Sequence, residues 1–249
     1  MSSSFEEQKD NAKQILERLD HDLREAIWCD ALFRRVQQHD DVSESFGNSY
    51  ETWGLIYSHR ALFFNLTMAL SRIIGGETDR ESTASLIKLN EIVKCDEFGE
   101  YLKKEQLNAI NGLTINDMIF TSERSKEEKE HLCQSFNEYD RSVFLEKFDD
   151  NLREIRSLFE KTKGMCGYGV LKNFRDSKLA HSSVSLSPRK GMPSLKYQHV
   201  TDTLDAVTKI ISQSNLFIFR TWRGYEDTKQ HADKCADLYW KKVICAANQ

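Results

Sequence analysis

The sequence predicts an all-α fold in which long amphipathic helices pack into one bundle. The 249 residues include only two Pro and 11 Gly, so few positions interrupt a helix. Apolar residues recur every three or four positions over most of the chain, which is the period of a helix with one buried face. Hydrophobic residues make up 39% and charged residues 30%, a balance that indicates a globular protein with one sizeable core.

Residues 5–38 predict the first helix or a pair of helices. The apolar residues of this segment repeat at near four-residue steps, in the order Ile15, Leu19, Leu23 and Ile27. Five charged residues are expected on a solvated face of this helix, namely Glu17, Arg18, Asp20, Asp22 and Arg24. Residues 39–49 are polar and predict a loop, where His39 lies beside two Asp residues but without a fourth metal ligand.

Residues 50–74 form the most apolar predicted helix, which ends at Gly75-Gly76. Because this segment is apolar nearly all round, we expect it at the centre of the bundle. Its two basic residues inside the apolar run, Arg60 and Arg72, are expected to reach solvent or to pair with acids at the bundle edge.

The middle of the chain predicts shorter helices followed by one long helix. Residues 86–93, 98–107 and 113–120 carry short apolar cores, so residues about 78–122 are expected to form a helical insertion that covers one end of the bundle. Residues 123–163 begin with a capping sequence and keep a helical apolar stripe. We expect the stripe to pack in the core, although a dimer interface would use the same residues: Leu132, Phe136, Tyr139, Val143, Phe148, Leu152, Ile155 and Phe159.

A glycine-punctuated stretch, Gly164–Gly169, breaks this long helix. No Gly-Lys-Ser/Thr follows at the spacing of a phosphate loop, so the glycines are expected to supply turn geometry. The next predicted helix is Val170–Ala180, and the loop after it, Ser182–Lys196, holds both prolines of the chain.

The last third of the chain predicts two more helices. Residues 198–222 are expected to close the core, and residues 225–249 to form a C-terminal helix that docks through Tyr239 and Trp240. The predicted organisation is therefore a helical domain over residues 1–224 with a helical extension over 225–249.

Polar chemistry is concentrated at the end of the predicted helix before the proline-containing loop, where Arg175, Asp176 and His181 lie close together in sequence. Histidine can give or take a proton near neutral pH, and the planar fork of an arginine matches a phosphate. Directed at one phosphate, the pair would suit transesterification of RNA. The His would move protons on or off the 2′-hydroxyl or the leaving oxygen, and the Arg would stabilise charge on phosphorus.

The spacing of the pair leaves two arrangements open. Six residues along a straight helix place Arg175 and His181 about 120° apart around the axis. Either the helix ends before His181 and its ring swings back, or the two groups meet across a twofold axis in a homodimer. The competing interpretation is that His181 is an ordinary helix cap and that the pair arises by chance.

The charge of the chain restricts how RNA could be bound. The formal net charge is −4 and the sequence pI is about 6.0, so no global basic field gathers nucleic acid and any contact must be local. Local basic residues do surround the pair, because Lys172 and Lys178 share its helix and Arg189 and Lys190 lie in the loop that follows. That loop predicts either an RNA-contacting flap or an ordinary connector, and Arg60 is a further candidate for contact with the phosphates.

The Cys and His residues exclude several other classes of site. The six Cys form no Cys-x-x-Cys pair, and no set of His, Cys and carboxylate residues has metal-ligand spacing, so we expect reduced thiols, no metal and no cofactor. The N-terminus is polar and acidic rather than a signal peptide, and no apolar run approaches the ~20 residues of a membrane span. A cytoplasmic location is expected.

The string RDSKLAHS, residues 175–182, resembles the signature of HEPN domains, in the abortive-infection U-type branch of that superfamily. The helix Ser58–Ile74 is similar as well, and the likeness spans roughly residues 10 to 220. The resemblance implies an α-helical domain that dimerises and cleaves single-stranded RNA without metal, often in phage defence or toxin–antitoxin systems. It also implies that Arg175 and His181 are catalytic and that Asp176 orients them.

One departure concerns regulation. Related toxins that are paired with a nucleotidyltransferase antitoxin carry a Tyr two residues beyond the His, and Ser183 stands there in this sequence. Two hypotheses remain. The first is a metal-independent endoribonuclease that acts as a homodimer, with RNA as substrate and an antitoxin or defence protein as a further partner. The second is a non-catalytic helical module that binds RNA, a nucleotide or a protein.

Overall fold

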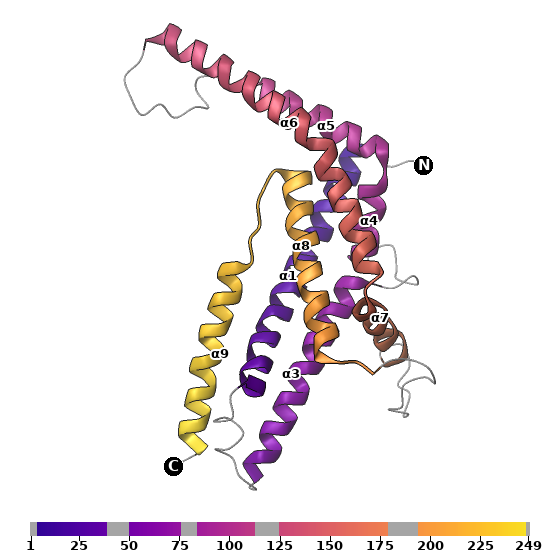
Figure 1. Cartoon of the computed structure of the whole chain (residues 1–249), viewed down its shortest axis with the longest axis vertical. Helices are drawn as coiled ribbons and strands as arrows, with labels where there is room; N and C mark the ends of the chain where they lie inside the picture. Colours follow the sequence, from indigo (N-terminus) through magenta and orange to yellow (C-terminus); the bar gives the residue numbers. More distant parts are fainter. Residues whose placement is uncertain (1–3, 39–49, 76–83, 113–124, 179–193, 248–249) are drawn as a thin grey trace.

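The structure, a computed structural model, describes residues 4–38, 50–75, 84–112, 125–178 and 194–247. The regular elements in these ranges are all α-helices, so the predicted all-α class is confirmed (Figure 1). Their bounds are α1 Phe5–Gln38, α3 Tyr50–Ile74, α4 Leu86–Lys94, α5 Asp96–Asn111, α6 Lys126–Lys163, α7 Cys166–Lys178, α8 Tyr197–Phe219 and α9 Glu226–Ala247. The loop expected at 39–49, with His39, and the short helix expected at 113–120 lie outside the described residues.

Helix α1 is the central element of the bundle, because α3, α8 and α9 all pack against it. Figure 1 shows these helices as long rods that run alongside one another, while α4, α5 and α6 gather at one end. Leucines at four-residue steps on α1, such as Leu19 and Leu23, are fully buried, as are Leu70 of α3 and Ile210 of α8. The periodicity of the apolar residues therefore predicts the buried side of α1 correctly.

In the middle of the chain, the predicted helices at 86–93 and 98–107 and the predicted cap of the long helix are confirmed. Ser125 caps α6, since its hydroxyl accepts a hydrogen bond from Glu128 N while the Glu128 carboxylate accepts one from Ser125 N. Helices α4 and α5 pack against α1 and α6, and they bring Leu89 and Phe98 into the main core.

The expected burial of the α6 stripe is wrong for its first half. Phe148, Ile155 and Phe159 are buried, whereas Leu132, Phe136 and Tyr139 are exposed. Figure 1 gives the reason, because the first part of α6 extends past the end of the bundle, where α1 and α8 do not reach it.

The central position expected for α3 is also wrong for one half of the helix. The second half supplies Leu66, Leu70 and Ile73 to the core, but Trp53 and Tyr57 in the first half are exposed. Among the described residues, the first half is covered on the side where Leu55 packs with Trp240 of α9. A helix with apolar residues on every side is therefore not necessarily packed on every side.

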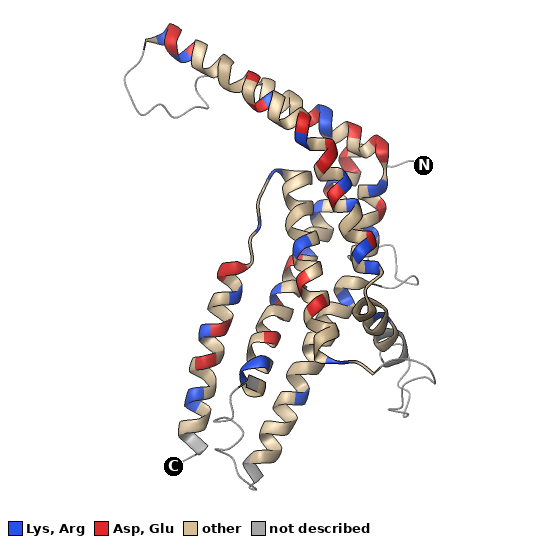
Figure 2. Cartoon of the chain, in the orientation of Figure 1, with Lys and Arg blue, Asp and Glu red and all other residues tan. Residues whose placement is uncertain are grey.

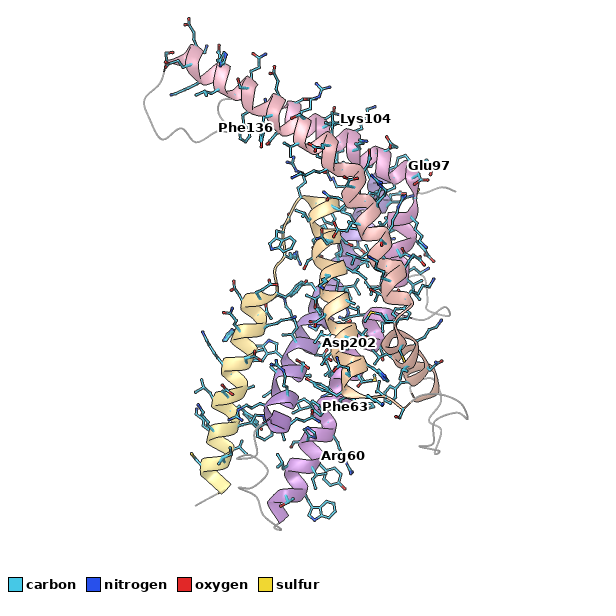
Figure 3. All side chains as sticks on the ribbon, viewed as in Figure 1. Arg60, Phe63, Glu97, Lys104, Phe136 and Asp202 are labelled. Carbon is cyan, nitrogen blue, oxygen red and sulfur yellow. The ribbon has the colours of Figure 1, made fainter. Side chains whose placement is uncertain are left out.

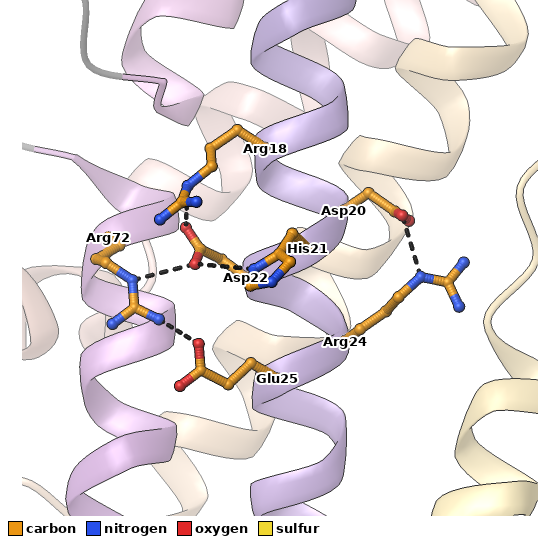
Figure 4. Close-up of polar contacts among 7 residues, drawn as sticks. All are labelled: Arg18, Asp20, His21, Asp22, Arg24, Glu25 and Arg72. Carbon is orange, nitrogen blue, oxygen red and sulfur yellow. Dashed lines mark hydrogen bonds and ion pairs between the residues drawn. The ribbon is translucent and has the colours of Figure 1, made fainter.

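The charged face expected on α1 is only partly solvated. Asp22 retains 2% of its surface and binds Arg72 of α3 (Figure 4). Asp20 accepts a hydrogen bond of 2.6 Å from the Tyr225 hydroxyl. Glu17, Arg18 and Arg24 are exposed as expected, whereas Asp20 and Asp22 lie on sides of α1 that other helices cover. The prediction that Arg72 pairs with acids is confirmed.

The C-terminal helix docks through one of its two expected anchors. Trp240 is buried and donates a hydrogen bond of 3.1 Å from Nε1 to the Leu32 carbonyl, whereas Tyr239 is exposed. Helix α8 ends at Phe219 rather than at residue 222, because Arg220 adopts the left-handed conformation with φ 53°. Among the helices that the structure describes, none combines the length and hydropathy that a membrane crossing needs.

Candidate functional site

Helix α7 carries the first part of the predicted motif and packs between α3 and α8. Leu171 is fully buried, and Tyr168 is nearly so. At Gly167 the backbone of α7 comes so close to α8 that a Cβ atom would lie 2.4 Å from the His199 carbonyl oxygen and 2.6 Å from Thr203 Oγ1. The helix break is confined to Gly164 and Met165, so the expectation of turn geometry is wrong for Gly167. This glycine allows two helices to approach each other instead.

The end of α7 lies against α3. The rings of Phe174 and Phe64 meet edge to face, with centroids 6.4 Å apart. Arg175 and Asp176 follow Phe174 directly, and their backbone continues the helix to Lys178. The structure describes side chains of α7 only as far as Phe174, and the arrangement of Arg175 and Asp176 therefore stays a prediction.

Three other predicted site residues lie outside the described ranges. His181, Arg189 and Lys190 belong to residues 179–193, between α7 and α8. The backbone of Arg175, Asp176 and Lys178 forms the last turn of α7. Whether the side chains of Arg175 and His181 meet stays a prediction.

Two basic candidates are described in full. Arg60 is exposed on α3, one turn before Phe64, and thus lies on the helix that α7 packs against. Lys172 is half-buried on α7. Arg60 therefore lies one helical turn from Phe64, the α3 residue whose ring meets Phe174 of α7, and its contact with RNA stays a prediction.

The start of α8 is anchored to α1 and α3 by a cluster of rings around Phe33. The Tyr197 hydroxyl donates a hydrogen bond of 2.6 Å to Asp30 Oδ1, and the His59 ring stacks on Phe33 with centroids 4.1 Å apart. Burial and the hydrogen bond to Asp30 raise the pKa of Tyr197, and burial lowers the pKa of His59. The cluster fixes the chain at the point where it returns from residues 179–193.

A thiol and an imidazole meet at the other end of α7. Cys166 Sγ lies 3.9 Å from His199 Nε2, and His199 Nδ1 accepts a hydrogen bond of 3.3 Å from Lys196 N. That acceptor role leaves the proton of a neutral ring on Nε2, facing the sulfur. The two residues are 33 positions apart, so no sequence spacing points to this contact.

The comparisons with known proteins decide the family. The family model HEPN_AbiU2, described as AbiU2, matches residues 9–238, which is nearly the whole chain. The chain belongs to the HEPN_AbiU2 family. The resemblance noted in the sequence is thereby confirmed, and the matched span includes the positions of Arg175, Asp176 and His181. Searches among curated proteins and among solved structures gave no match.

One group of side chains in this HEPN_AbiU2 protein has the geometry of metal ligands. Possible ligand atoms of His21, Asp22 and Glu25 on α1 lie within 4.8 Å of one another. However, the Arg72 guanidinium donates hydrogen bonds to both carboxylates, and Arg18 lies 3.7 Å from Asp22 (Figure 4). The negative charge of this group is already balanced by arginine, so it is an ion-pair network that joins α1 to α3.

The sequence analysis does not predict the exposed aromatic side chains on α3, the helix that α7 packs against. Trp53, Tyr57 and Phe64 were assigned to a central helix by their apolar character, yet all three are exposed. One signal was present in the sequence, since positions 53, 57, 60 and 64 fall on one side of a helix. That side carries Arg60, which is a poor candidate for a core position.

Proposed function

We propose that this HEPN_AbiU2 protein is a metal-independent endoribonuclease that cleaves single-stranded RNA as a homodimer. The observation that carries the proposal is the family match over residues 9–238, a span that includes Arg175 and Asp176 in the sequence of α7 and His181 after it. The location of exposed Arg60 on the helix next to α7 supports it further, because a second cation beside the motif suits a phosphate backbone.

In the proposed reaction the 2′-oxygen of a ribose attacks the adjacent phosphorus, and the bond from phosphorus to the 5′-oxygen breaks. His181 takes the proton from the 2′-hydroxyl or delivers one to the leaving 5′-oxygen. Arg175 stabilises the charge that develops on the phosphoryl oxygens, and Asp176 orients Arg175 or His181. The products carry a 2′,3′-cyclic phosphate and a 5′-hydroxyl.

The setting of the reaction belongs to the same proposal. We place the protein in the cytoplasm, acting in phage defence or with an antitoxin, and its six cysteines are present as thiols, as befits a reducing compartment. The alternative is a non-catalytic module that binds RNA, a nucleotide or a protein, and the net charge of −4 favours it.

The test is cleavage of end-labelled single-stranded RNA in EDTA by wild type, Arg175→Ala and His181→Ala. Exposed residues of the same type on α6 provide matched controls, Arg141→Ala and His131→Ala. We expect cleavage with cyclic-phosphate ends by wild type and both controls and a loss of at least about a hundredfold in the two site variants. Absence of wild-type cleavage, or equal cleavage by all five proteins, would exclude this enzyme and leave the binding module.

Mixing the two inactive variants tests whether the site is composite. If Arg175 of one subunit works with His181 of the other, a mixed dimer holds one intact site. Half of the dimers in an equimolar mixture are mixed, so about a quarter of the wild-type rate should return. No recovery, in a mixture shown to exchange subunits, would place both groups in one subunit.

A further inference from the structure

Helix α3 exposes a row of aromatic side chains between Trp53 and Phe64. Trp53 is 60% exposed, Tyr57 is 64% exposed and Phe64 is 46% exposed, with Arg60 exposed between them. Steps of four, three and four residues place all four on one side of the helix, over a length of about 16 Å. We define these four residues as the α3 row.

The α3 row is distinct from the side of the helix that packs. Leu55 packs with Trp240 and Leu62 lies against the same small cluster, while Phe63 faces Phe33 of α1. Three large rings left in water cost free energy, since about 25 cal/mol is lost for each Å² of apolar surface that stays exposed. The side chains of the row therefore suit binding rather than folding of the described part of the chain.

The α3 row leads to the motif helix. Phe64, at its end, meets Phe174 of α7 edge to face, and Phe174 directly precedes Arg175. At the other end the rings of Trp53 and Tyr57 are 6.5 Å apart. The row therefore reaches α7 through the Phe64–Phe174 contact, one residue before Arg175 in the sequence.

The charge of this surface selects an anionic ligand. No Asp or Glu occurs from Thr52 to Ile74, whereas α1, α5, α6 and α9 all carry acidic residues (Figure 2). Arg60 lies within the row, and Lys172, Arg175 and Lys178 make the sequence of α7 net basic. In a chain of net charge −4, this local excess of cations beside aromatic rings is complementary to a polymer with phosphate groups and flat bases.

We propose that the α3 row is a base-stacking track that holds single-stranded RNA and leads it to the end of α7. Trp53, Tyr57 and Phe64 each stack on a base, and Arg60 pairs with a backbone phosphate. A duplex presents no free base faces at its flank, so the track selects single strands. The proposal rests on the proposed function for its substrate class, but it concerns binding and not cleavage.

The test measures binding separately from cleavage. Each variant is made in a His181→Ala background, and its affinity for a labelled single-stranded RNA and for the matching duplex is measured by fluorescence anisotropy in EDTA. The variants are Trp53→Leu, Tyr57→Leu and Phe64→Leu, because leucine removes the flat ring but keeps an apolar side chain for any protein contact.

The chain offers a control of the same residue type and equal exposure for each ring. Trp222 is 60% exposed, Tyr139 is 66% exposed and Phe136 is 48% exposed, and all three lie outside the row. Figure 3 shows Phe136 and Arg60 at opposite ends of the molecule. Arg60→Gln is compared with Arg141→Gln on α6, where the side chain is also exposed.

We expect each row variant to weaken binding of the single strand about tenfold, and each matched control to leave it within about twofold. Arg60→Gln should make the plot of log affinity against log salt less steep by about 0.7. The track would be overturned by equal losses of affinity in the row variants and their controls, or by equal affinity for the single strand and the duplex. Absence of RNA binding would overturn it as well.

A second copy of the chain could also bind the α3 row. Sedimentation of the same variants distinguishes this possibility from RNA binding. Row variants that lower self-association while the remaining dimers bind RNA with unchanged affinity would overturn the track and make the row an interface. The test of the track is independent of the test of nuclease activity. Cleavage by wild type, together with unaltered RNA binding by the row variants, would support the nuclease and contradict the track. RNA binding that depends on the rings, without cleavage by wild type, would support the track and contradict the nuclease.

Discussion

Arg72, in the last turn of α3, donates a hydrogen bond of 3.1 Å from Nε to Oδ1 of Asp22, in the middle of α1. The Asp22 carboxylate is buried, and the same guanidinium also binds Glu25. This contact joins α1 and α3, the two helices that pack against each other most extensively in the described part of the chain, and Figure 4 shows how Arg18 and His21 surround it. Since α3 also bears Arg60 and supports α7, the contact fixes the helix on which the candidate site is built.

The first prediction concerns the removal of Arg72. Arg72→Met should lower the free energy of unfolding by about 2–3 kcal/mol, because a buried carboxylate loses its main partner while part of the arginine is already in solvent. Arg153→Met is the control, since the ion pair of Arg153 with Asp150 is exposed and should contribute at most about 0.5 kcal/mol. Urea denaturation at a fixed protein concentration measures both. Equal effects would show that Asp22 is solvated.

A second prediction uses two glycines of α7. Gly167→Ala should destabilise the fold by about 1–3 kcal/mol, because its Cβ would collide with the backbone of α8 at His199. Gly169→Ala, where nothing lies within 4 Å of the added atom, should stabilise the helix by up to about 1 kcal/mol. Thermal unfolding of the two variants provides the measurement. A harmless Gly167→Ala would contradict the close contact of α7 with α8.

The third prediction is a dependence of stability on pH that comes from His59. Burial lowers its pKa in the folded state, whereas the unfolded chain binds the proton with the usual value of 6.5. Below about pH 6.5 the unfolded state therefore holds more protons, and the free energy of unfolding falls as the pH falls. His59→Phe keeps the stacking on Phe33 and should flatten the curve of stability against pH between 5 and 7.

The control for the pH prediction is His131→Gln, which changes an exposed imidazole on α6. It should leave the slope of stability against pH as it is in wild type. A slope that disappears with His131→Gln, or persists in His59→Phe, would assign the titration to another residue.

The fourth prediction concerns the docking of α9. Trp240→Ala should cost about 3–5 kcal/mol, because a buried indole and its hydrogen bond to the Leu32 carbonyl are both lost. Tyr239→Ala, at the exposed neighbouring position, should change stability by no more than about 0.5 kcal/mol. Trypsin cleavage after Lys241 and Lys242 should become faster in the first variant only. Similar rates in both would mean that α9 does not depend on Trp240.

The positions of the helices were predictable because the signals for them are local. Apolar periodicity and polar boundaries predict helices over 5–38 and 50–74, and the structure has the same bounds for α1 and α3. The capping box at Ser125 and Glu128 was equally readable, since both partners lie within one turn of the chain. The Arg175-Asp176 and His181 positions and the family resemblance also follow from the order of residues alone.

Contacts between helices were not predictable in the same way. Sequence alone determined the helices, their order and the family of this chain, since these depend on neighbours within a few residues. Only the tertiary structure decided that Asp22 is buried against Arg72 and that α8 packs closely against α7 at Gly167. It also decided that Trp53, Tyr57 and Phe64 remain in solvent. The physical reason is that burial depends on which sides of a helix other helices cover, and residues far apart in the sequence determine that coverage.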